Sequence, residues 1–469
     1  MMRYLVAIAA SVALASAALA VQSQPEIPST PAGRFTSAWL DAFNSADLKK
    51  LEQFSALYDV KLPPQVSIDI HGITGRLKPV RVESSAPNEI TVLMSAEHGD
   101  SFVRQKASMD PSNPMKVANV QLEPADRPPE FALPRMPRAE LNRMISEKMS
   151  RDVATDRFAG TMIVERHGKV IYRSAAGLAD RTTRVPVTFD TRFRIGSANK
   201  MFTAVGVLQL VEKGEISLDA PVGEYLKDYP NQDFAKMVTV RQLLTHTGGA
   251  GNIFTPEYDA KRLEVRTPQD YVSLFGSRAP DTSANGKNTY ANYGFVLLGR
   301  ILEVASGQDY YDYVQKHILS PAGMKDTGSL PEEIAVPNRS RGYTKKDGKL
   351  VDNAGTLPYR GSPAGGGYTT AADLIRFGNA LRSGKLLSKV MLKQATSPQR
   401  PDGWYGLGFS VGGQGVTRNW GHGGGVPGMN AAFRVYPELD AVVVVLANLD
   451  PTAADNQADY YANRMALGE

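Results

Sequence analysis

Residues 194–202 read Arg-Ile-Gly-Ser-Ala-Asn-Lys-Met-Phe and place Ser197 and Lys200 three positions apart. The apolar run that continues from Met201 predicts a helix buried on all sides, which Gly214 ends in the left-handed conformation. Residues three apart lie on one helical face, so the serine hydroxyl and the lysine amine can meet. Such a pair suits a nucleophile and the base that activates it.

Ser197 lies at the expected N-terminus of this helix, where free backbone N–H groups gather. One of these groups could stabilise an oxyanion, and the positive end of the helix would lower the pKa of a partly desolvated Lys200. The simpler alternative is a serine N-cap followed by a solvated lysine, because Ser-x-x-Lys is a common chance pattern. The rest of the chain must decide between the two.

The composition is that of a globular protein with more than one domain. The chain has 469 residues, of which 42% are hydrophobic and 22% charged, and its net charge is +5. No run of Lys and Arg is dense enough to form a nucleic-acid surface. The absence of cysteine excludes disulfides, a thiol nucleophile and thiolate metal sites.

Residues 1–20 have the pattern of a signal peptide. Arg3 is followed by a short apolar run and by Ala18-Leu-Ala20, which fits a small-x-small cleavage site. We therefore expect an exported protein, periplasmic or secreted from a bacterium, without a lipid anchor because the chain has no cysteine. No other stretch is apolar enough to span a bilayer, so stable membrane insertion is not expected after cleavage.

Residues 28–123 predict a small α+β module. The expected helix spans residues 35–54, and alternating apolar residues predict strands at 66–70, 81–84, 90–94, 102–106 and 117–122. A helix followed by strands resembles cystatin-like or nuclear-transport-factor-like modules. His71 and His98 stand alone here, and no catalytic constellation is present.

A linker at residues 124–137 contains five prolines and separates this module from a second domain at 138–469. That domain should begin with a helix at 138–149 and a hairpin at 160–174. A mostly helical part to about residue 399 precedes strands at 405–411, 424–436 and 441–447 and a helix at 455–465. Strands at both ends predict one antiparallel sheet, with the helical part beside it and a cleft between them.

Two further motifs follow Ser197 in sequence order. Tyr290-Ala-Asn292 precedes an apolar helix, and offers a phenol that can relay protons and an amide that can hold a carbonyl group or the lysine. Residues 420–428 read Trp-Gly-His-Gly-Gly-Gly-Val-Pro-Gly, and glycines in a strand allow a ligand close to the backbone. Each motif alone is equally compatible with an ordinary turn.

In this order, Ser-x-x-Lys, Tyr-x-Asn and His-x-Gly resemble the serine β-lactamases and penicillin-recognising enzymes. The resemblance is greatest to the class C β-lactamase-related branch, with the family VIII esterases and D-stereospecific peptidases. It extends from about residue 158 to the C-terminus. Further stretches carry it: Leu243-Leu-Thr-His-Thr-Gly-Gly, Pro321-Ala-Gly-Met and Gly365-Gly-Gly-Tyr-Thr-Thr-Ala-Ala-Asp-Leu.

The resemblance implies a role for each motif residue. Ser197 is expected to be the nucleophile, Lys200 its base, and Tyr290 the proton relay to the leaving group and later to water. Asn292 would orient Lys200 and the substrate, while the expected substrate-binding strand contains His422, Gly423, Gly424 and Gly425. Gly425 would supply the second oxyanion N–H. His422 replaces a lysine found in many relatives. This weakens carboxylate recognition, because a neutral imidazole lacks the positive charge of an ammonium group.

Two other motifs compete with this interpretation. Gly408-Phe-Ser410-Val-Gly412 matches the Gly-x-Ser-x-Gly pattern of α/β-hydrolases, but no helix follows it as that motif requires. His246-Thr-Gly248 matches His-x-Gly but lacks the strand context, so we expect a structural role. The six histidines make no metal-binding motif.

The sequence therefore predicts an α+β fold, with an antiparallel sheet flanked by helices and an all-helical subdomain, after a small N-terminal α+β domain. It predicts a serine hydrolase that forms an acyl-enzyme on Ser197 without metal or cofactor, most plausibly on carboxylic esters or related small acyl compounds. The alternatives are a β-lactamase, a peptidase acting on D-amino-acid peptides of the cell wall, and a non-catalytic binding protein that kept the fold. Oligomeric state is left open.

Overall fold

The computed structural model describes residues 25–281, 290–346 and 348–468. The chain divides into two compact units, Met1–Pro128 and Pro129–Glu469. The expected linker at 124–137 therefore contains the division, while the expected signal peptide lies outside the described residues. None of the helices in these ranges combines the length and hydropathy that crossing a membrane requires.

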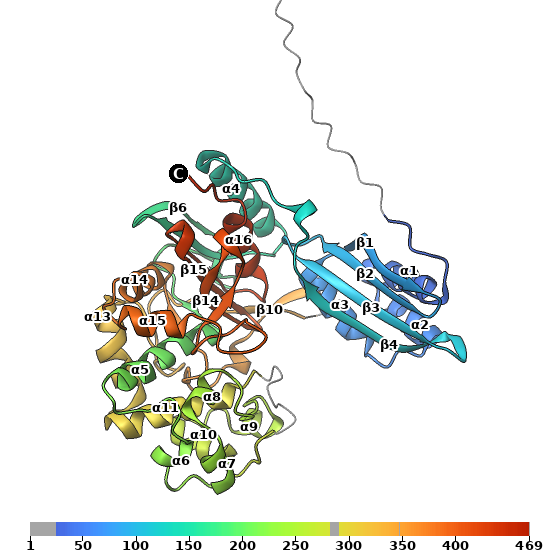
Figure 1. Ribbon diagram of the computed structural model, residues 1–469. Helices are drawn as coiled ribbons and strands as arrows, with labels where there is room; N and C mark the ends of the chain where they lie inside the picture. Colours follow the sequence, from blue (N-terminus) through green and yellow to red (C-terminus); the bar gives the residue numbers. More distant parts are fainter. Residues whose placement is uncertain (1–24, 282–289, 347, 469) are drawn as a thin grey trace, which may run out of the picture. The chain divides into compact units, whose positions relative to one another are not determined.

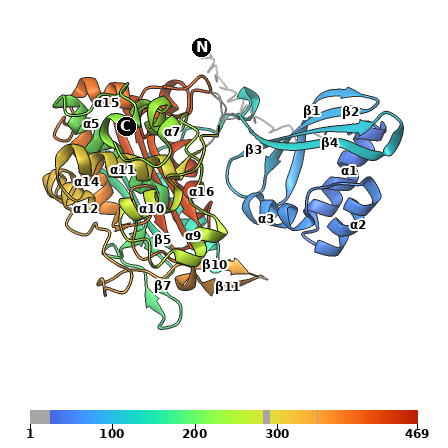
Figure 2. The same ribbon diagram turned by 90° about the horizontal axis from the view of Figure 1, so that it is seen from below.

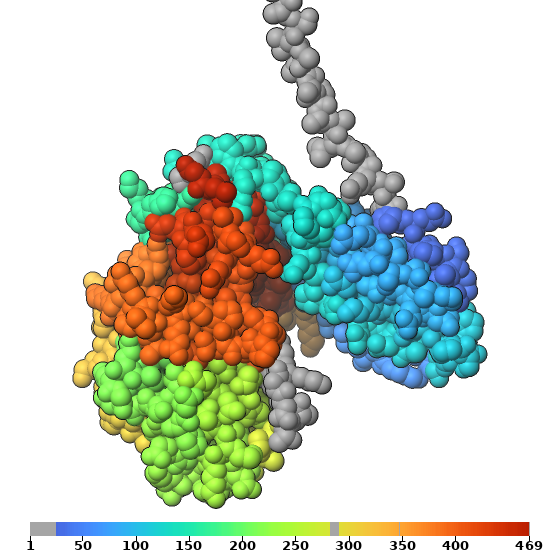
Figure 3. Space-filling view, viewed as in Figure 1, coloured from blue at the N-terminus to red at the C-terminus, as the bar shows by residue number. Residues whose placement is uncertain are grey.

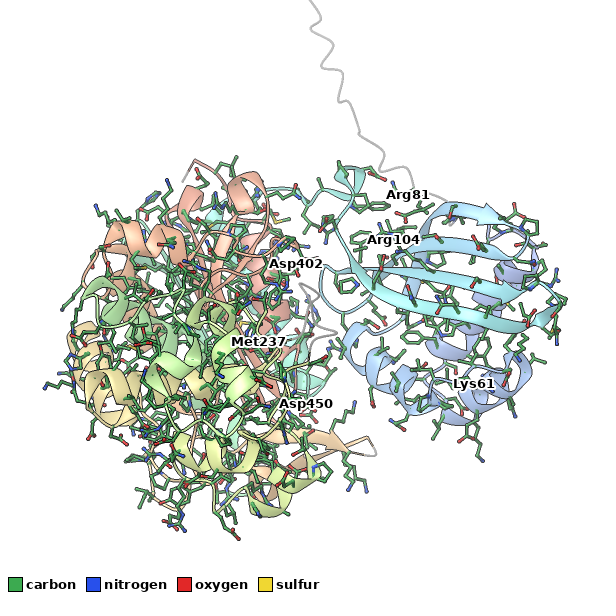
Figure 4. All side chains as sticks on the ribbon, turned by 60° about the horizontal axis from the view of Figure 1, so that its bottom comes forward. Lys61, Arg81, Arg104, Met237, Asp402 and Asp450 are labelled. Atoms are coloured by element: carbon green, nitrogen blue, oxygen red, sulfur yellow. The ribbon has the colours of Figure 1, made fainter. Side chains whose placement is uncertain are left out.

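The first unit is a four-stranded antiparallel sheet with three helices on one face (Figure 2). Its helices and strands are, in order, α1 Pro31–Asn44, α2 Leu48–Tyr58, α3 Pro64–Thr74, β1 Leu77–Ala86, β2 Glu89–Ala96, β3 Phe102–Asp110 and β4 Asn113–Ala125. The strands lie in sequence order. Figure 4 shows Arg81 and Arg104 on the strand side of this unit and Lys61 on its helical side. Arg104 pairs there with Glu83, so this face is charged.

Two expectations for the first unit were wrong in detail. The single helix at 35–54 is two helices, because Ala46 is left-handed and Asp47 caps a new helix start. Residues 66–70 form no strand but lie within α3, which Pro64 begins as a first-turn proline. In the helix, Ser67 and Thr74 lie seven positions apart on one face and are buried, while Ile68 and Ile70 pack partly buried against the core of this unit. The other four predicted strands fall within β1 to β4.

The second unit contains the predicted antiparallel sheet, with six strands in the order β13-β14-β15-β16-β5-β6. Their bounds are β5 Gly160–Arg166, β6 Lys169–Ala176, β13 Ser410–Gly412, β14 Asn419–Val426, β15 Met429–Tyr436 and β16 Ala441–Ala447. His167 and Gly168 both have positive φ, as a tight hairpin between β5 and β6 requires. The sheet thus joins strands from both ends of the domain, as the sequence predicted.

Helices cover both faces of this sheet (Figure 1). Helices α4 (Arg138–Ala154) and α16 (Ala453–Ala462) pack on one face, and α5 (Lys200–Glu212) and α14 (Ala371–Arg382) on the other. Strand β16 is buried on both faces, which explains its continuous apolar sequence. Val443 and Val445 contact the first pair of helices, whereas Val442 and Val444 belong to the core on the α5 side.

The remaining helices form the predicted helical part beside the sheet. They are α6 Val222–Tyr225, α7 Gln232–Met237, α8 Val240–Leu244, α9 Pro256–Lys261, α10 Pro268–Phe275, α11 Asn292–Ser306, α12 Tyr310–Val314, α13 Ser320–Ala322 and α15 Lys389–Ala395. Short strands outside the six-stranded sheet are β7 Leu178–Asp180, β8 Val185–Pro186, β9 Phe193–Arg194, β10 Tyr343–Lys346, β11 Lys349–Asp352 and β12 Tyr368–Thr369. In Figure 3 the segment after α15, in orange, packs directly on this helical part, in green.

The C-terminal strand predictions need two corrections. Residues 424–436 are two strands, β14 and β15, separated by a turn at Pro427 and Gly428. Residues 405–409 form no strand, because Gly406 and Gly408 pack against helices. A Cβ on these glycines would stand 2.0 Å from the Ala395 carbonyl oxygen and 2.2 Å from the Ala204 Cβ.

Candidate active site

Ser197 lies in one 3-10 turn, Gly196–Asn199, directly before α5. Gly196 has a φ of +50°, which glycine adopts without strain. Its carbonyl oxygen accepts a hydrogen bond from the backbone N–H of Gly366, at 3.1 Å. The helix ends as predicted, with Gly214 in the left-handed conformation.

Strand β14 approaches the Ser197 turn backbone to backbone. A Cβ on Gly424 would stand 1.8 Å from the Ile195 carbonyl oxygen and 3.0 Å from the Ser197 nitrogen. The nitrogen of Gly425 lies 3.2 Å from the place of a Cβ on Gly196. Gly424 is therefore required for this packing, and the Gly425 nitrogen lies next to the Ser197 turn.

Lys200 is fully buried and meets Ser197, since its Nζ lies 3.0 Å from the Ser197 Oγ. Two other acceptors surround the amine: the Asn292 Oδ1 at 2.8 Å and the carbonyl oxygen of Ala364. The loop that carries Ala364 is held to α5, because Thr203 donates to the Pro363 carbonyl oxygen at 2.7 Å. The amine is thus fixed by groups from three separate parts of the chain.

Burial holds the pKa of Lys200 well below its ordinary value, because the charged form loses its hydration. No carboxylate in the described part of the chain pairs with it at ion-pair distance. A neutral amine has two N–H groups and one lone pair. Asn292 and Ala364 can accept the two hydrogens, which leaves the lone pair for the Ser197 hydroxyl proton.

The predicted Tyr-x-Asn motif also reaches this centre. The ring of Tyr290 lies 4.8 Å from the Lys200 Nζ, and Asn292 begins helix α11. Burial raises the pKa of Tyr290, and the nearby Ser197 hydroxyl only opposes that rise, so the phenol keeps its proton. Its hydroxyl forms no regular hydrogen bond with the described residues. A phenol in this state is a proton donor, not a base.

His422 borders the same cleft, but both its ring nitrogens already have protein partners. The Nδ1 lies 2.5 Å from the Gly423 carbonyl oxygen, and the Nε2 lies 2.8 Å from the Tyr405 hydroxyl. The carbonyl can only accept, so Nδ1 carries the proton and Tyr405 donates to Nε2. Burial lowers the pKa of His422 to about 3, and the imidazole is neutral near pH 7.

Sequence reasoning missed the groups that hold these motifs in place. Asn252 accepts a hydrogen bond from the Asn292 Nδ2 at 3.0 Å and so orients the amide toward Lys200. His246 is structural, as expected: its Nδ1 accepts from the Ala291 N–H at 3.1 Å, and its ring lies 4.2 Å from that of Tyr290. Only the fold brings these residues next to the Tyr-x-Asn motif.

A buried arginine fastens the wall behind Tyr290. The Arg400 Nη1 donates to the carbonyl oxygens of Thr245 and His246 at 2.9 and 3.2 Å. The same guanidinium pairs with Asp402, which also accepts from the Trp404 indole N–H at 3.1 Å. This pair therefore joins the loop of His246 to the loop of Trp404. No sequence motif marks Arg400.

The cleft at Ser197 has a volume of about 520 Å³ and is lined by Tyr290, Trp404, Ser410, Asn419, His422 and Arg434, among others. Ser410 lies in β13 and donates to the Gly421 carbonyl oxygen at 3.0 Å, and no basic side chain of the described ranges bonds to it. It is therefore not arranged as an activated nucleophile. The described residues also contain no group of three or more acidic or histidine side chains suited to a metal ion.

The model of the beta-lactamase family matches residues 141–467, which is more than half of the chain. The chain belongs to the beta-lactamase family. It has the family's mixed α+β fold and is a β-lactamase-related serine hydrolase, as the motifs predicted.

Named relatives within this family differ in activity. Penicillin-binding protein 4 of Amycolatopsis lactamdurans is 29% identical over 303 residues, covering 59% of this chain and 77% of that protein. Esterase EstB of Burkholderia gladioli is 35% identical over 190 residues, 37% of this chain and 48% of EstB. The structure is similar to that of D-amino acid amidase from Ochrobactrum anthropi SV3, with a TM-score of 0.59, 25% identity and coverage of 69% and 98% of the two chains.

Replacement of Gly424 tests the close approach of β14 to Ser197. In Gly424→Ala the new methyl group would overlap the Ile195 carbonyl oxygen and displace the Ser197 turn. We expect kcat/KM for any hydrolysed ester to fall at least about 100-fold, as small displacements of reacting groups do. Gly355→Ala is the matched control, because its Cβ would meet no atom within 4 Å. Equal activity of the two variants would contradict this packing role.

Proposed function

We propose that the protein hydrolyses uncharged carboxylic esters and related small acyl compounds through an acyl-enzyme on Ser197. The observation that carries the proposal is the buried Lys200 amine, 3.0 Å from the Ser197 Oγ and without a carboxylate partner among the described residues. Its lowered pKa lets it accept the serine proton near neutral pH. The intact set of Ser197, Lys200 and Tyr290 argues against a binding protein that lost catalysis.

In the proposed reaction the Ser197 Oγ attacks the carbonyl carbon while its proton passes to Lys200. The oxyanion would be held by the N–H groups of Ser197 and Gly425, which the β14 packing brings together. Tyr290 then donates its proton to the departing alkoxide and recovers one from the Lys200 ammonium. Water next attacks the acyl-enzyme and gives a proton to the neutral Lys200 amine, which passes it to the departing Ser197 oxygen, so that the acid is released and Ser197 is restored.

The charge of the cleft supports substrates without a carboxylate. His422, in the position where many relatives have lysine, is neutral and bonded through both nitrogens. Arg434 also borders the cleft, but it pairs with Asp455 at 2.9 Å and with Asp459 at 3.8 Å. Neither side chain offers an unpaired positive charge to a free carboxylate, as a β-lactam or a peptide C-terminus would need.

The likeness to a D-amino acid amidase supports a second candidate, the hydrolysis of amides of D-amino acids. Such amides also lack a carboxylate, so the same cleft would accept them. Export is part of our proposal and rests only on Arg3 and the apolar run that follows it. A small acyl compound outside the cytoplasm would then be the partner, and a cell-wall peptide with a free C-terminal carboxylate would be disfavoured.

A matched pair of esters tests the substrate class. We expect kcat/KM for p-nitrophenyl butyrate to exceed that for the p-nitrophenyl monoester of succinic acid at least about tenfold, because neither His422 nor Arg434 offers an unpaired positive charge to the second acid end. Both activities should disappear in Ser197→Ala. Preference for the charged ester would contradict the proposed class, and ester cleavage that survives in Ser197→Ala would contradict the nucleophile. A D-phenylalanine amide, assayed alongside, distinguishes the second candidate.

Tyr290→Phe tests the proton donor. A p-nitrophenolate leaves without protonation, whereas an alkoxide needs a proton as it departs. We expect the variant to lose about 100-fold in kcat/KM on ethyl butyrate. Its loss on p-nitrophenyl butyrate should be about tenfold or smaller. Equal losses on the two esters would indicate that Tyr290 only shapes the cleft.

A further inference from the structure

A second cavity, of about 370 Å³, lies in the second unit away from the Ser197 cleft. The start of α4, the β5–β6 hairpin and the end of α16 enclose it, and Figure 1 shows α4, β6 and the chain end close together. The cavity shares no lining residue with the Ser197 cleft, and it borders the core on the α4 and α16 face of the sheet. The proposed hydrolysis makes no use of it.

One wall of this cavity is apolar. Leu141, Ile171 and Met465 line it, together with Val170, which is unusually exposed for a valine at 53%. Tyr461 also lines the cavity. Its hydroxyl donates to the Asn142 Oδ1 at 2.6 Å, so the hydroxyl is already bonded and the ring is the part left to line the cavity. An aliphatic chain of a small ligand could therefore replace water along these side chains with a favourable free energy.

A buried arginine lies at one side of the cavity. Arg166 is 5% exposed, and among the described residues its partners are carbonyl oxygens: Nε donates to Leu439 at 3.2 Å, Nη1 to Ala466 at 2.8 Å and Nη2 to Leu467 at 2.9 Å. A guanidinium has five N–H groups, so one remains on each Nη. Nearly all buried charges have a counter-charge, and no carboxylate in the described ranges pairs with Arg166.

The other charges at the cavity have the same sign. Arg138, His167 and Lys169 complete its basic lining, and no acidic residue lines it. Asp440, which contacts the hairpin through His167 at 2.9 Å, is also paired with Arg382. The cavity therefore combines an apolar wall with a positive side, which is complementary to an anion that carries an apolar chain.

We propose that this cavity binds a monocarboxylate with an aliphatic chain. The chain lies against Leu141, Val170 and Ile171, and the carboxylate accepts the two remaining N–H groups of Arg166. The planar fork of a guanidinium matches the two oxygens of a carboxylate. Lys169, on the exposed edge of the hairpin, adds a second positive charge without an ion pair in the described chain.

Calorimetric titration of the full-length protein with decanoate and with decanol tests this proposal. We expect decanoate to bind at one site per chain and decanol about tenfold or more weakly, because the charge-assisted hydrogen bonds are absent from the alcohol. Equal affinity of the two compounds, or no binding of decanoate, would overturn the proposal. So would tighter binding of decyl phosphate, which would indicate a phosphate site.

Variants locate the binding. Lys169→Glu reverses an exposed charge at the cavity and should weaken decanoate binding about tenfold or more while ester hydrolysis at Ser197 stays unchanged. Lys393→Glu, on α15, is the matched control and should bind like the wild type. Val170→Asp, at an exposed position, should also weaken binding, so the test does not depend on Arg166, whose bonds hold the chain end. Unchanged affinity in Lys169→Glu and Val170→Asp would place decanoate elsewhere, for instance in the Ser197 cleft.

Discussion

The burial of the Lys200 amine without a carboxylate partner among the described residues is the constraint on which the candidate site depends. A charged lysine there would lose its hydration with no compensating anion, so the neutral form is favoured. Asn292 and Ala364 accept the two amine hydrogens, and the remaining lone pair faces Ser197. The same burial keeps Tyr290 protonated. The same buried environment thus favours a neutral Lys200, which can act as a base, and a protonated Tyr290, which can act as an acid.

Glycines allow the fold to create this environment, because segments distant in sequence can pack backbone to backbone where no Cβ intervenes. Gly196 and Gly424 let the Ser197 turn and β14 meet backbone to backbone, and the Gly366 N–H bonds to the Gly196 carbonyl oxygen at 3.1 Å. The Lys200 amine is buried, and the Gly425 nitrogen lies next to the Ser197 turn. Arg400 holds the aromatic wall behind Tyr290 in a comparable way, through the carbonyl oxygens of the His246 loop.

The order and spacing of the motifs were enough to predict the family, the sheet shared by both ends of the domain and the meeting of Ser197 with Lys200. The sequence could not show that His422 is bonded through both nitrogens, because Tyr405 reaches it only in the folded chain. Asn252 and Arg400 were missed for the same reason. Residues 66–70 were misassigned because an alternation of only five residues does not determine the structure, whereas Pro63 and Pro64 just before it fit the start of a helix. The kinship of the N-terminal module with a known module family stays a prediction.

The pH dependence of covalent labelling of Ser197 by an uncharged fluorophosphonate tests the central claim most directly. Below its lowered pKa, Lys200 is protonated and cannot accept the serine proton; above it, labelling is fast. The account predicts a single adduct, mapped to Ser197 by mass spectrometry, with a rate constant that reaches its plateau well below the ordinary pKa range of lysine, about 10.4. A rate constant that rises only toward pH 10, or an adduct on Ser410, would contradict it.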